Sequence, residues 1–218
     1  MKAATVSTNN SERTRVRRHP ERSAPTQAQT FLTQGTVAHV GFVADGQPFV
    51  IPFTYEYNLG APDKLYLHGS PASRALKRIA AGEPICITVT ITDAIIYSRS
   101  AMYHSMNYRS VMCFGRGRLL ESAEEKRRVF EAMTSRYLPG RIAGVDYEAA
   151  PLEHLNATAL IEVAIEEMSG KTRTGGPAGP HDAQPDALGS AGVFELTAGE
   201  CPEARVNGSC PFSKADQL

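Results

Sequence analysis

The chain has 218 residues, of which 42% are hydrophobic and 21% are charged, and its 23 lysines and arginines balance 23 aspartates and glutamates. This composition is typical of a globular protein with one sizeable domain, and the neutral net charge argues against nucleic acid as the main partner. Because no apolar run is long enough to span a bilayer and the N-terminus lacks the apolar core of a signal peptide, we expect a cytoplasmic protein without membrane contact.

The four cysteines do not suggest a disulfide framework. Cys86 and Cys113 fall in apolar, strand-like runs, and core thiols in a reducing compartment are the expectation for them. Cys201 and Cys210 lie near the C-terminus, where the sequence leaves open whether they bridge.

Residues 1–24 form a polar, locally basic segment. Its basic side chains are Arg13, Arg15, Arg17, Arg18 and Arg22. A transit peptide or a nucleic-acid arm would have such a composition, but Glu12 and Glu21 interrupt it and no aromatic residue is interleaved for base stacking. We therefore predict an extended arm that lies on the domain or on a partner subunit.

A domain spanning residues 25–171 begins with a short helix, Thr26 to Gln34, closed by Gly35. From Thr36 the apolar period changes to two, and the run TVAHVGFVA, the turn Asp45-Gly46 and the run QPFVIPFTYEY predict a β-hairpin. Phe49, Ile51, Phe53 and Tyr55 should share one face of the second strand. Pro52 cannot donate a ladder hydrogen bond, so we expect a bulge or an open edge there, beside which a planar ligand could lie.

The segment LYLHGSPASR, from Leu65 to Arg74, is the most informative stretch. Its strand ends at His68-Gly69, Ser70 is predicted as the N-cap of a helix and Pro71 as its first residue, and Gly82 should close that helix. The helix start would offer unpaired N–H groups to an anion such as phosphate, and Arg74 could reach back as a clamp. The alternative is that Ser70 only caps the helix and Arg74 is solvated.

Further along, Pro84 to Ser100 predicts a strand with one apolar face and one face of small hydroxyls, followed by a polar segment, residues 101–110, and a strand from Val111 to Leu120. Ser122-x-x-Glu125 is a capping box. The helix that follows should bury Val129, Phe130, Met133 and Tyr137 and end at Pro139-Gly140. Thr158 to Met168 predicts the last strand, and residues 172–218 an extended Gly/Pro-rich tail that is partly ordered at best. About six strands with few helices indicate a mainly β, antiparallel barrel with helical decoration.

Other chemistries have little support. The six histidines show no His-x-x-x-His spacing, there is no Cys-x-x-Cys, and neither a nucleophile elbow nor a complete dinucleotide fingerprint occurs, so no metal site is expected. His39 is expected to be a core or interface histidine. A barrel with a phosphate-suited turn and few catalytic constellations suits a bound phosphorylated cofactor that performs the difficult chemistry.

The runs VAHVGFVADGQPFVIPFTYEY, LYLHGSPASR, ICITVTITD and SMNYRSVMCFGRGRLL follow one another in an order that resembles the pyridoxamine 5′-phosphate oxidase-like family. The resemblance covers Arg13 to Lys171 and is strongest to the flavin-nucleotide-binding branch related to the 5-nitroimidazole reductases. It implies a six-stranded antiparallel split β-barrel of the FMN-binding type. It also implies a homodimer that holds FMN at the subunit interface.

The same resemblance implies the site residues. The phosphate-binding turn corresponds to His68, Gly69, Ser70, Ser73 and Arg74, and the strand against the flavin ring to Val50, Ile51, Pro52 and Phe53. Tyr108, Arg109 and Ser110 would reach the flavin of the other subunit, with Gly170 and Lys171 closing the site, and His68 would be the catalytic residue beside the flavin. This chain has His-Gly-Ser where the nitroimidazole reductases usually have His-Ser-Ala, and its tail lacks the basic motifs for a vitamin B6 phosphate.

Three functions follow as expectations. The first is an FMN-dependent oxidoreductase acting on a small molecule, nitroreductase-like, with NAD(P)H as a donor. The second is a non-catalytic carrier of flavin (FMN or FAD) or haem, in which His68 or His104 would be the axial ligand. The third and weakest is a DNA-binding or scaffolding protein that uses the basic arm. Tyr103, His104 and Asn107 are expected at a dimer interface, and Tyr108 and Arg109 could touch flavin or only protein.

Overall fold

A computed structural model of the protein describes residues 7–8, 11–57, 59 and 61–196. The chain divides into two units, which are described separately. Unit 1 comprises residues 1–91 and 108–174, and unit 2 comprises residues 92–107 and 175–218. Cys201 and Cys210 lie outside the described residues, so the possibility of a bridge between them stays a prediction.

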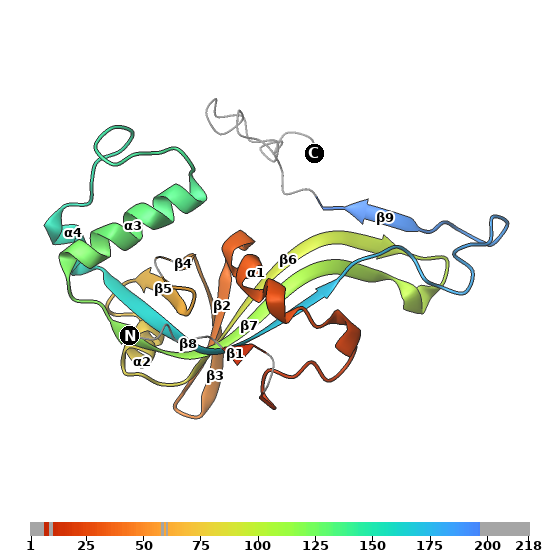
Figure 1. Ribbon diagram of the computed structural model, residues 1–218, viewed down its shortest axis with the longest axis horizontal. Coiled ribbons are helices and arrows are strands. Elements are labelled where there is room, and N and C mark those ends of the chain that lie inside the picture. Colours follow the sequence, from red (N-terminus) through yellow and green to blue (C-terminus); the bar gives the residue numbers. More distant parts are fainter. Residues whose placement is uncertain (1–6, 9–10, 58, 60, 197–218) are drawn as a thin grey trace, which may run out of the picture. The chain divides into compact units, whose positions relative to one another are not determined.

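The strands form one sheet in which β3, β2, β6, β7, β8, β5 and β4 are successive neighbours, with β1 added to β8 and β9 to β6 (Figure 1). Their bounds are β1 Ser7–Thr8, β2 Ala38–Ala44, β3 Gln47–Phe53, β4 Tyr55–Tyr57, β5 Lys64–Gly69, β6 Ile85–Tyr97, β7 Ser105–Leu119, β8 Ala159–Arg173 and β9 Gly192–Glu195. The helices are α1 Ala28–Gln34, α2 Arg74–Ala80, α3 Ala123–Tyr137 and α4 Leu152–Ala157, with short 3₁₀ turns at Pro20–Arg22, Pro25–Gln27 and Ala101–Tyr103.

Strands β3 and β4 lie at opposite ends of this strand order, yet only Thr54 separates them in the sequence. A sheet whose two ends are joined by one residue must curl around, which is the geometry of a barrel. All pairings described among β2 to β9 are antiparallel, so the predicted mainly β, antiparallel fold class is confirmed. The sheet has nine strands within the described residues rather than the expected six, because β1 and β9 join it and the predicted second hairpin strand divides into β3 and β4.

The β2–β3 hairpin forms as predicted. Asp45 and Gly46 have φ angles of 52° and 78°, the left-handed pair that a tight hairpin turn needs. Phe42 and Phe49 stack across the hairpin with ring centroids 5.5 Å apart. Within the described residues β3 pairs with β2 alone, which leaves its other edge open, one of the two outcomes expected from Pro52.

Alternate side chains of the strands point into the barrel interior, where they pack with residues of α1. Leu65, Leu67, Ile87, Ile161 and Val163 are among its fully buried members. Burial of such side chains contributes about 1.5–3 kcal/mol each, so this interior is the main source of stability. α1 occupies the predicted position and ends at Gly35.

Helix α3 packs on the other face of β5, over a smaller cluster formed by Tyr66, Leu120, Val129, Met133 and Leu160. Ser122 Oγ accepts a hydrogen bond from the Glu125 amide at 3.3 Å, which confirms the predicted cap. Near the other end, the Arg136 guanidinium donates to the carbonyls of Leu32 (2.7 Å), Gly35 (2.6 Å) and Tyr55 (3.1 Å). One side chain therefore ties α3 to the end of α1 and to β4.

Several elements differ from the predictions. β7 begins at Ser105 rather than Val111, and β8 continues to Arg173, because the two strands stay paired beyond the predicted ends, from Tyr108 opposite Arg173 to Leu119 opposite Ile161. Backbone pairing therefore overrides the polar side chains of residues 105–110. The six-residue α4 was not predicted, since only Leu155 on it is buried and so short a helix has no visible period.

The N-terminal arm lies along β8 of its own chain. β1 pairs with β8 in parallel, and Arg13 forms ion pairs with Glu166 (3.0 Å) and Glu167 (2.6 Å). At its other end, the Ala24 amide donates to Gly170 O at 2.9 Å. Of the two predicted locations of the arm, the one on the domain is therefore observed.

In unit 2, β9 pairs with residues 94–97 of β6. The Asp182 carboxylate accepts hydrogen bonds from the Ser98 hydroxyl (2.9 Å) and from the amides of Arg99 (2.7 Å) and Gly179 (2.6 Å). A strand and a carboxylate-centred turn thus occur within residues 172–218, for which a partly ordered tail was expected. Among the described residues, no helix has both the length and the apolar character that a membrane span requires.

Candidate functional site

The connection from β5 to α2 is a β-turn followed by a capped helix. The Ser73 amide donates to Ser70 O at 2.9 Å, which places Pro71 at the second position of the turn, where proline is favoured. Ser73 Oγ accepts from the Leu76 amide at 3.4 Å, so Ser73 is the N-cap. The prediction that Ser70 caps the helix and that Pro71 begins it was wrong, because the proline is used by the turn that precedes α2.

Arg74, the first residue of α2, lies over the ring of Phe49, with Cζ 4.0 Å from the ring centroid. This contact joins the β5–α2 turn to β3, although the two are 25 positions apart in sequence. Ser70 is exposed and Ser73 half-buried, so their hydroxyls and the guanidinium lie together at an accessible corner. Hydroxyls and a guanidinium are groups that bind phosphate.

His68 is half-buried at the end of β5 and packs edge-on against Phe130 of α3, with ring centroids 5.3 Å apart. Its Nδ1 is buried without a hydrogen-bond partner among the described residues. Burial lowers the pKa of the imidazole, so the neutral form is favoured. The next residue is Gly69, and a Cβ added there would lie 3.2 Å from Leu76 Cδ1, so the glycine leaves that space open.

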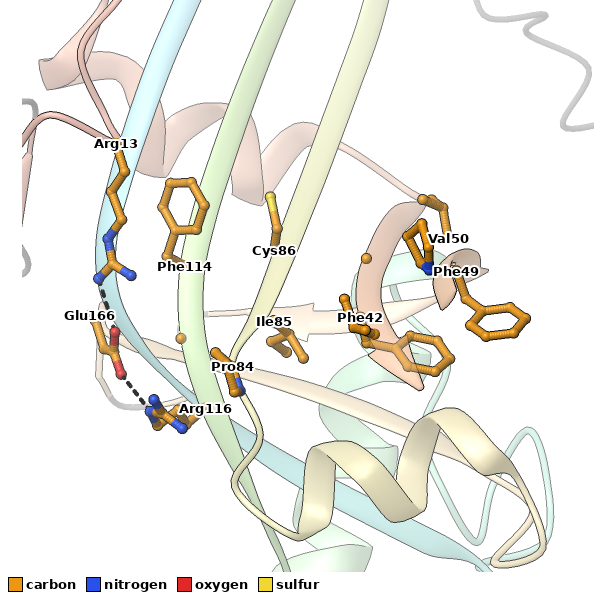
Figure 2. Close-up of a pocket in the computed structure, with 14 residues that line it drawn as sticks. Arg13, Phe42, Phe49, Val50, Pro84, Ile85, Cys86, Phe114, Arg116 and Glu166 are labelled. Atoms are coloured by element: carbon orange, nitrogen blue, oxygen red, sulfur yellow. Dashed lines mark hydrogen bonds and ion pairs between the residues drawn. The ribbon is translucent and has the colours of Figure 1, made fainter. Parts of the chain in front are cut away.

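A cavity of about 380 Å³, which we call the β3 cavity, lies on the outward face of β2, β3, β6 and β7 (Figure 2). Its lining residues are Arg13, Gly41, Phe42, Val43, Pro48, Phe49, Val50, Pro84, Ile85, Cys86, Phe114, Gly115, Arg116 and Glu166. Val50 is 67% exposed, and Gly41 leaves backbone uncovered on the cavity floor. The cavity wall is therefore mainly apolar and partly bare backbone.

One side of the β3 cavity carries a row of alternating charges. Glu166 lies between Arg13 (3.0 Å) and Arg116 (3.4 Å), as the dashed lines in Figure 2 show. Because Arg13 also pairs with Glu167, these charges are mutually compensated. On the floor, burial raises the pKa of the Cys86 thiol, which keeps it protonated and a weak nucleophile.

A second cavity, of about 350 Å³, lies beneath the N-terminal arm, and we call it the arm cavity. It is lined by Thr14, Arg15, Val16, Arg17, Arg18, Thr88, Ser110, Val111, Met112, Ser169 and Lys171. Ser110 and Lys171 face each other across the β7–β8 pair, and Ser110 Oγ donates to Lys171 O at 3.4 Å.

The structure therefore separates the predicted site residues into three groups. Val50 lines the β3 cavity and Arg74 contacts Phe49 of the same strand, whereas Ser110 and Lys171 line the arm cavity. The remaining predicted residues, Ile51, Pro52, Phe53, His68, Gly69, Ser70, Ser73, Tyr108 and Arg109, line neither cavity. Arg109 lies on β7 opposite Thr172 and donates to Gln34, so one of its contacts is to protein.

Two further expectations concern histidines and metals. His39 is exposed on the outward face of β2 opposite Pro52, so it is not a core residue, because only its neighbours Ala38 and Val40 point inward. In the part of the chain that the structure describes, no group of three or more His, Cys, Asp or Glu side chains is placed to hold a metal ion.

The comparison with family models shows to which family this chain belongs. Residues 25–172 match the model described as pyridoxamine 5′-phosphate oxidase. The chain belongs to this family. The resemblance carried by its strand and turn motifs is thereby confirmed, although no curated protein sequence matches the chain.

Solved structures support the same conclusion. A flavocytochrome from Azotobacter vinelandii is 30% identical with a TM-score of 0.71, and the match covers 88% of this chain and 87% of that one. An FAD and haem binding protein from Mycobacterium smegmatis is also 30% identical, with a TM-score of 0.68 over 85% of this chain and 95% of that one. A putative 5-nitroimidazole antibiotic resistance protein from Bacteroides thetaiotaomicron, 23% identical with a TM-score of 0.56 over 68% and 84% of the two chains, shares the fold.

Several lining residues were missed from the sequence. Arg116 and Glu166 lie 50 positions apart and meet only because β7 and β8 pair, with a register shift at Phe114/Gly115. Gly41 looked like an ordinary strand residue. A glycine in the middle of an otherwise apolar strand was the one available signal, since such a glycine often marks a close backbone approach.

Proposed function

We propose that this protein is an FMN-dependent oxidoreductase that binds the flavin ring in the β3 cavity and its phosphate at the β5–α2 turn. The observation that carries the proposal is the contact between Arg74 and Phe49, because it brings a phosphate-suited corner against β3, the strand that also lines the apolar cavity. The structural neighbours named as a flavocytochrome and as an FAD and haem binding protein support a flavin.

The residues present fit such a cofactor. A Cβ at Gly41 would lie 3.4 Å from Cys86 O, so the glycine leaves the floor open to a planar group. The exposed edge of β3, where Val50 to Phe53 were predicted to face the ring, can present backbone groups. Arg74, Ser70 and Ser73 would bind the phosphate through charge and hydroxyl donors.

When bound, the flavin would supply the electron transfer between a reduced donor such as NAD(P)H and a small electrophilic or nitroaromatic acceptor. The protein would bind, orient and shield it. His68, proposed as the catalytic residue, is neutral near pH 7, because burial lowers its pKa, and could accept a proton. Its ring lies against Phe130, so a catalytic role requires that substrate reaches the α3 side of β5.

We further propose a cytoplasmic homodimer with the flavin at its interface. Tyr108, Arg109, Ser110 and Lys171 lie outside the β3 cavity of their own chain, which is the arrangement expected if they complete the site of a partner subunit. Light scattering of the purified protein tests this, and a monomer that retains its flavin would contradict it.

The experiment that tests the proposal is identification of the cofactor released from the purified protein by mass spectrometry, together with its absorbance spectrum. Arg74→Ala should weaken FMN binding by about 1–3 kcal/mol, roughly tenfold to a hundredfold, if the guanidinium contacts the phosphate. Lys77→Ala, one turn further along α2 and exposed, is the matched control and should bind FMN as the wild type does. Equal FMN affinity in both variants would contradict the assignment.

A second candidate is a non-catalytic carrier of flavin or haem. It is favoured by the haem named for the two neighbours that are 30% identical, and by the unpartnered, neutral imidazole of His68, the state that binds iron. A Soret band that disappears in His68→Gln would support the carrier. Flavin bands that bleach with NADPH and return with a nitro compound would support the oxidoreductase.

A further inference from the structure

The arm cavity is separate from the β3 cavity, and its lining is unusual. It contains the cationic side chains of Arg15, Arg17, Arg18 and Lys171, and no Asp or Glu. The lining of the β3 cavity, by contrast, includes Glu166 between two arginines. Uncompensated positive charge around an enclosed space raises the local concentration of anions.

The acidic groups near this cavity leave most of its charge free. Glu12 accepts from Arg17 at 2.6 Å and lies 3.6 Å from Arg15, so one carboxylate serves two guanidinium groups. Arg18 and the Lys171 ammonium form no hydrogen bond or ion pair within the described part of the chain. Two cations therefore line the cavity without a protein partner.

The arm is held in place independently of any ligand. On one side of residues 14–18, Arg13 pairs with Glu166 and Glu167; on the other, the Ala24 amide donates to Gly170 O and Ser23 forms a β-bridge with Lys171. Ordering a basic segment costs about 1–2 kcal/mol of backbone entropy per residue. These two anchors keep three arginines above the sheet before an anion arrives.

The other residues that line the arm cavity are of two kinds, polar and apolar. Thr14, Thr88, Ser110 and Ser169 contribute hydroxyls, and Val16, Val111 and Met112 contribute apolar surface. At about 350 Å³ the space is larger than a phosphate group needs and falls within the range of small-ligand pockets. Cations with hydroxyls suit phosphate oxygens, while the apolar wall suits an attached sugar or base.

We infer that the arm cavity is a second anion site, which binds the diphosphate portion of a nucleotide beneath the N-terminal arm. Arg18 and Lys171 contact the phosphate oxygens, and Arg15 is recruited from Glu12. The inference does not depend on flavin in the β3 cavity. A dinucleotide flavin and a pyridine dinucleotide donor both carry this diphosphate, and the experiment distinguishes them.

The probe is inorganic pyrophosphate, titrated calorimetrically into the full-length protein both with and without bound FMN. The double variant Arg15→Gln/Arg18→Gln should bind pyrophosphate at least about tenfold more weakly than the wild type. The matched control Arg127→Gln/Arg128→Gln removes the same charge from α3, outside the cavity, and should retain wild-type affinity. Absence of saturable binding to the wild type, or equal weakening in both variants, would overturn the proposal.

Competition then identifies the source of the diphosphate. Displacement of pyrophosphate by FAD but not by NADPH assigns the cavity to a flavin dinucleotide, and the reverse result assigns it to the donor. Displacement by neither nucleotide, nor by adenosine diphosphate, overturns the nucleotide assignment. Since flavin absorbance is recorded separately, a protein that binds pyrophosphate but no flavin would refute only the proposed function.

Discussion

The two cavities lie on the outward face of the same sheet and are similar in size, about 380 and 350 Å³, but they differ in how charge is arranged. In the β3 cavity each cation has a carboxylate partner, and aromatic and aliphatic groups dominate. In the arm cavity cations outnumber the nearby acids. The difference shows that pairing, rather than the number of charged side chains, determines the net charge left in a cavity, and we propose a planar ligand for the first cavity and an anion for the second on that basis.

The substitution with the largest expected effect displaces the arm and so removes the arm cavity. A Cβ at Gly170 would lie 2.2 Å from Ala24 O, so Gly170→Val must push the arm anchor away from β8. We expect a loss of about 1–3 kcal/mol in the free energy of unfolding, measured by urea denaturation, because the contact is with rigid backbone. Pyrophosphate binding should be lost.

The control for this variant is Gly176→Val, because a Cβ at Gly176 meets nothing within 4 Å. It should unfold at the wild-type urea concentration. Wild-type stability and wild-type pyrophosphate affinity in Gly170→Val would show that the arm does not form the second cavity.

A second substitution, with a smaller expected effect, fills the floor of the β3 cavity instead of disturbing the arm cavity. Gly41→Val adds a side chain whose Cβ meets only ordinary contacts, the nearest at 3.4 Å, so the protein should fold with unchanged or slightly raised stability. FMN affinity should fall by about tenfold or more, whereas pyrophosphate affinity should not change.

Thr90→Val provides the comparison, since Thr90 is an exposed residue of β6 that lines neither cavity. Fluorescence titration with FMN measures both variants. If Gly41→Val binds FMN as tightly as Thr90→Val does, the flavin ring does not lie on that floor.

The smallest effect is a pH dependence of the arm. Hydrogen bonds from Arg13 and Ser11 hold the pKa of Glu167 below its usual value. A carboxyl whose pKa is lowered by folding stabilises the folded state above its unfolded pKa of about 4.3, and this stabilisation is lost as the pH falls through the folded value. Acid should therefore loosen the arm before the barrel.

Hydrogen exchange, corrected for its intrinsic pH dependence, measures this order. Protection of residues 11–24 should fall at a higher pH than protection of the β2–β3 hairpin, residues 38–53. Simultaneous loss in both segments would show that the arm is not held separately, and Glu167→Gln should abolish the difference.

The sequence was sufficient wherever a local rule determines the structure. Asp45-Gly46 fixes a hairpin turn, Ser122 and Glu125 fix a helix start, and the alternation of Ile85, Ile87 and Val89 separates the inner and outer faces of β6. The family resemblance added the barrel, which the structure has, and a flavin site, which stays a prediction. These parts depend on neighbours in sequence or on motifs in a fixed order.

The features that could not be predicted from the sequence depend on pairing between distant strands. The row formed by Arg13, Glu166 and Arg116 exists because the arm and β7 flank β8 in one particular register. The same register places Lys171 under the arm rather than in the β3 cavity. Ser73 rather than Ser70 is the N-cap of α2, because Pro71 lies in the preceding turn and not at the first position of the helix. Proline suits both positions, and spacing alone cannot decide between them.

The Arg136 bridge has a consequence for synthesis of the protein. The carbonyl groups of Leu32, Gly35 and Tyr55 receive their guanidinium donor from a residue about a hundred positions later in the chain. Before α3 is synthesised, the Tyr55 hydroxyl remains the donor to the Leu32 and Gly35 carbonyls, whereas the Tyr55 carbonyl lacks its donors from Arg136 and Tyr137. A fragment released before α3 is made would therefore lack the guanidinium that joins the end of α1 to the carbonyl of Tyr55 in β4.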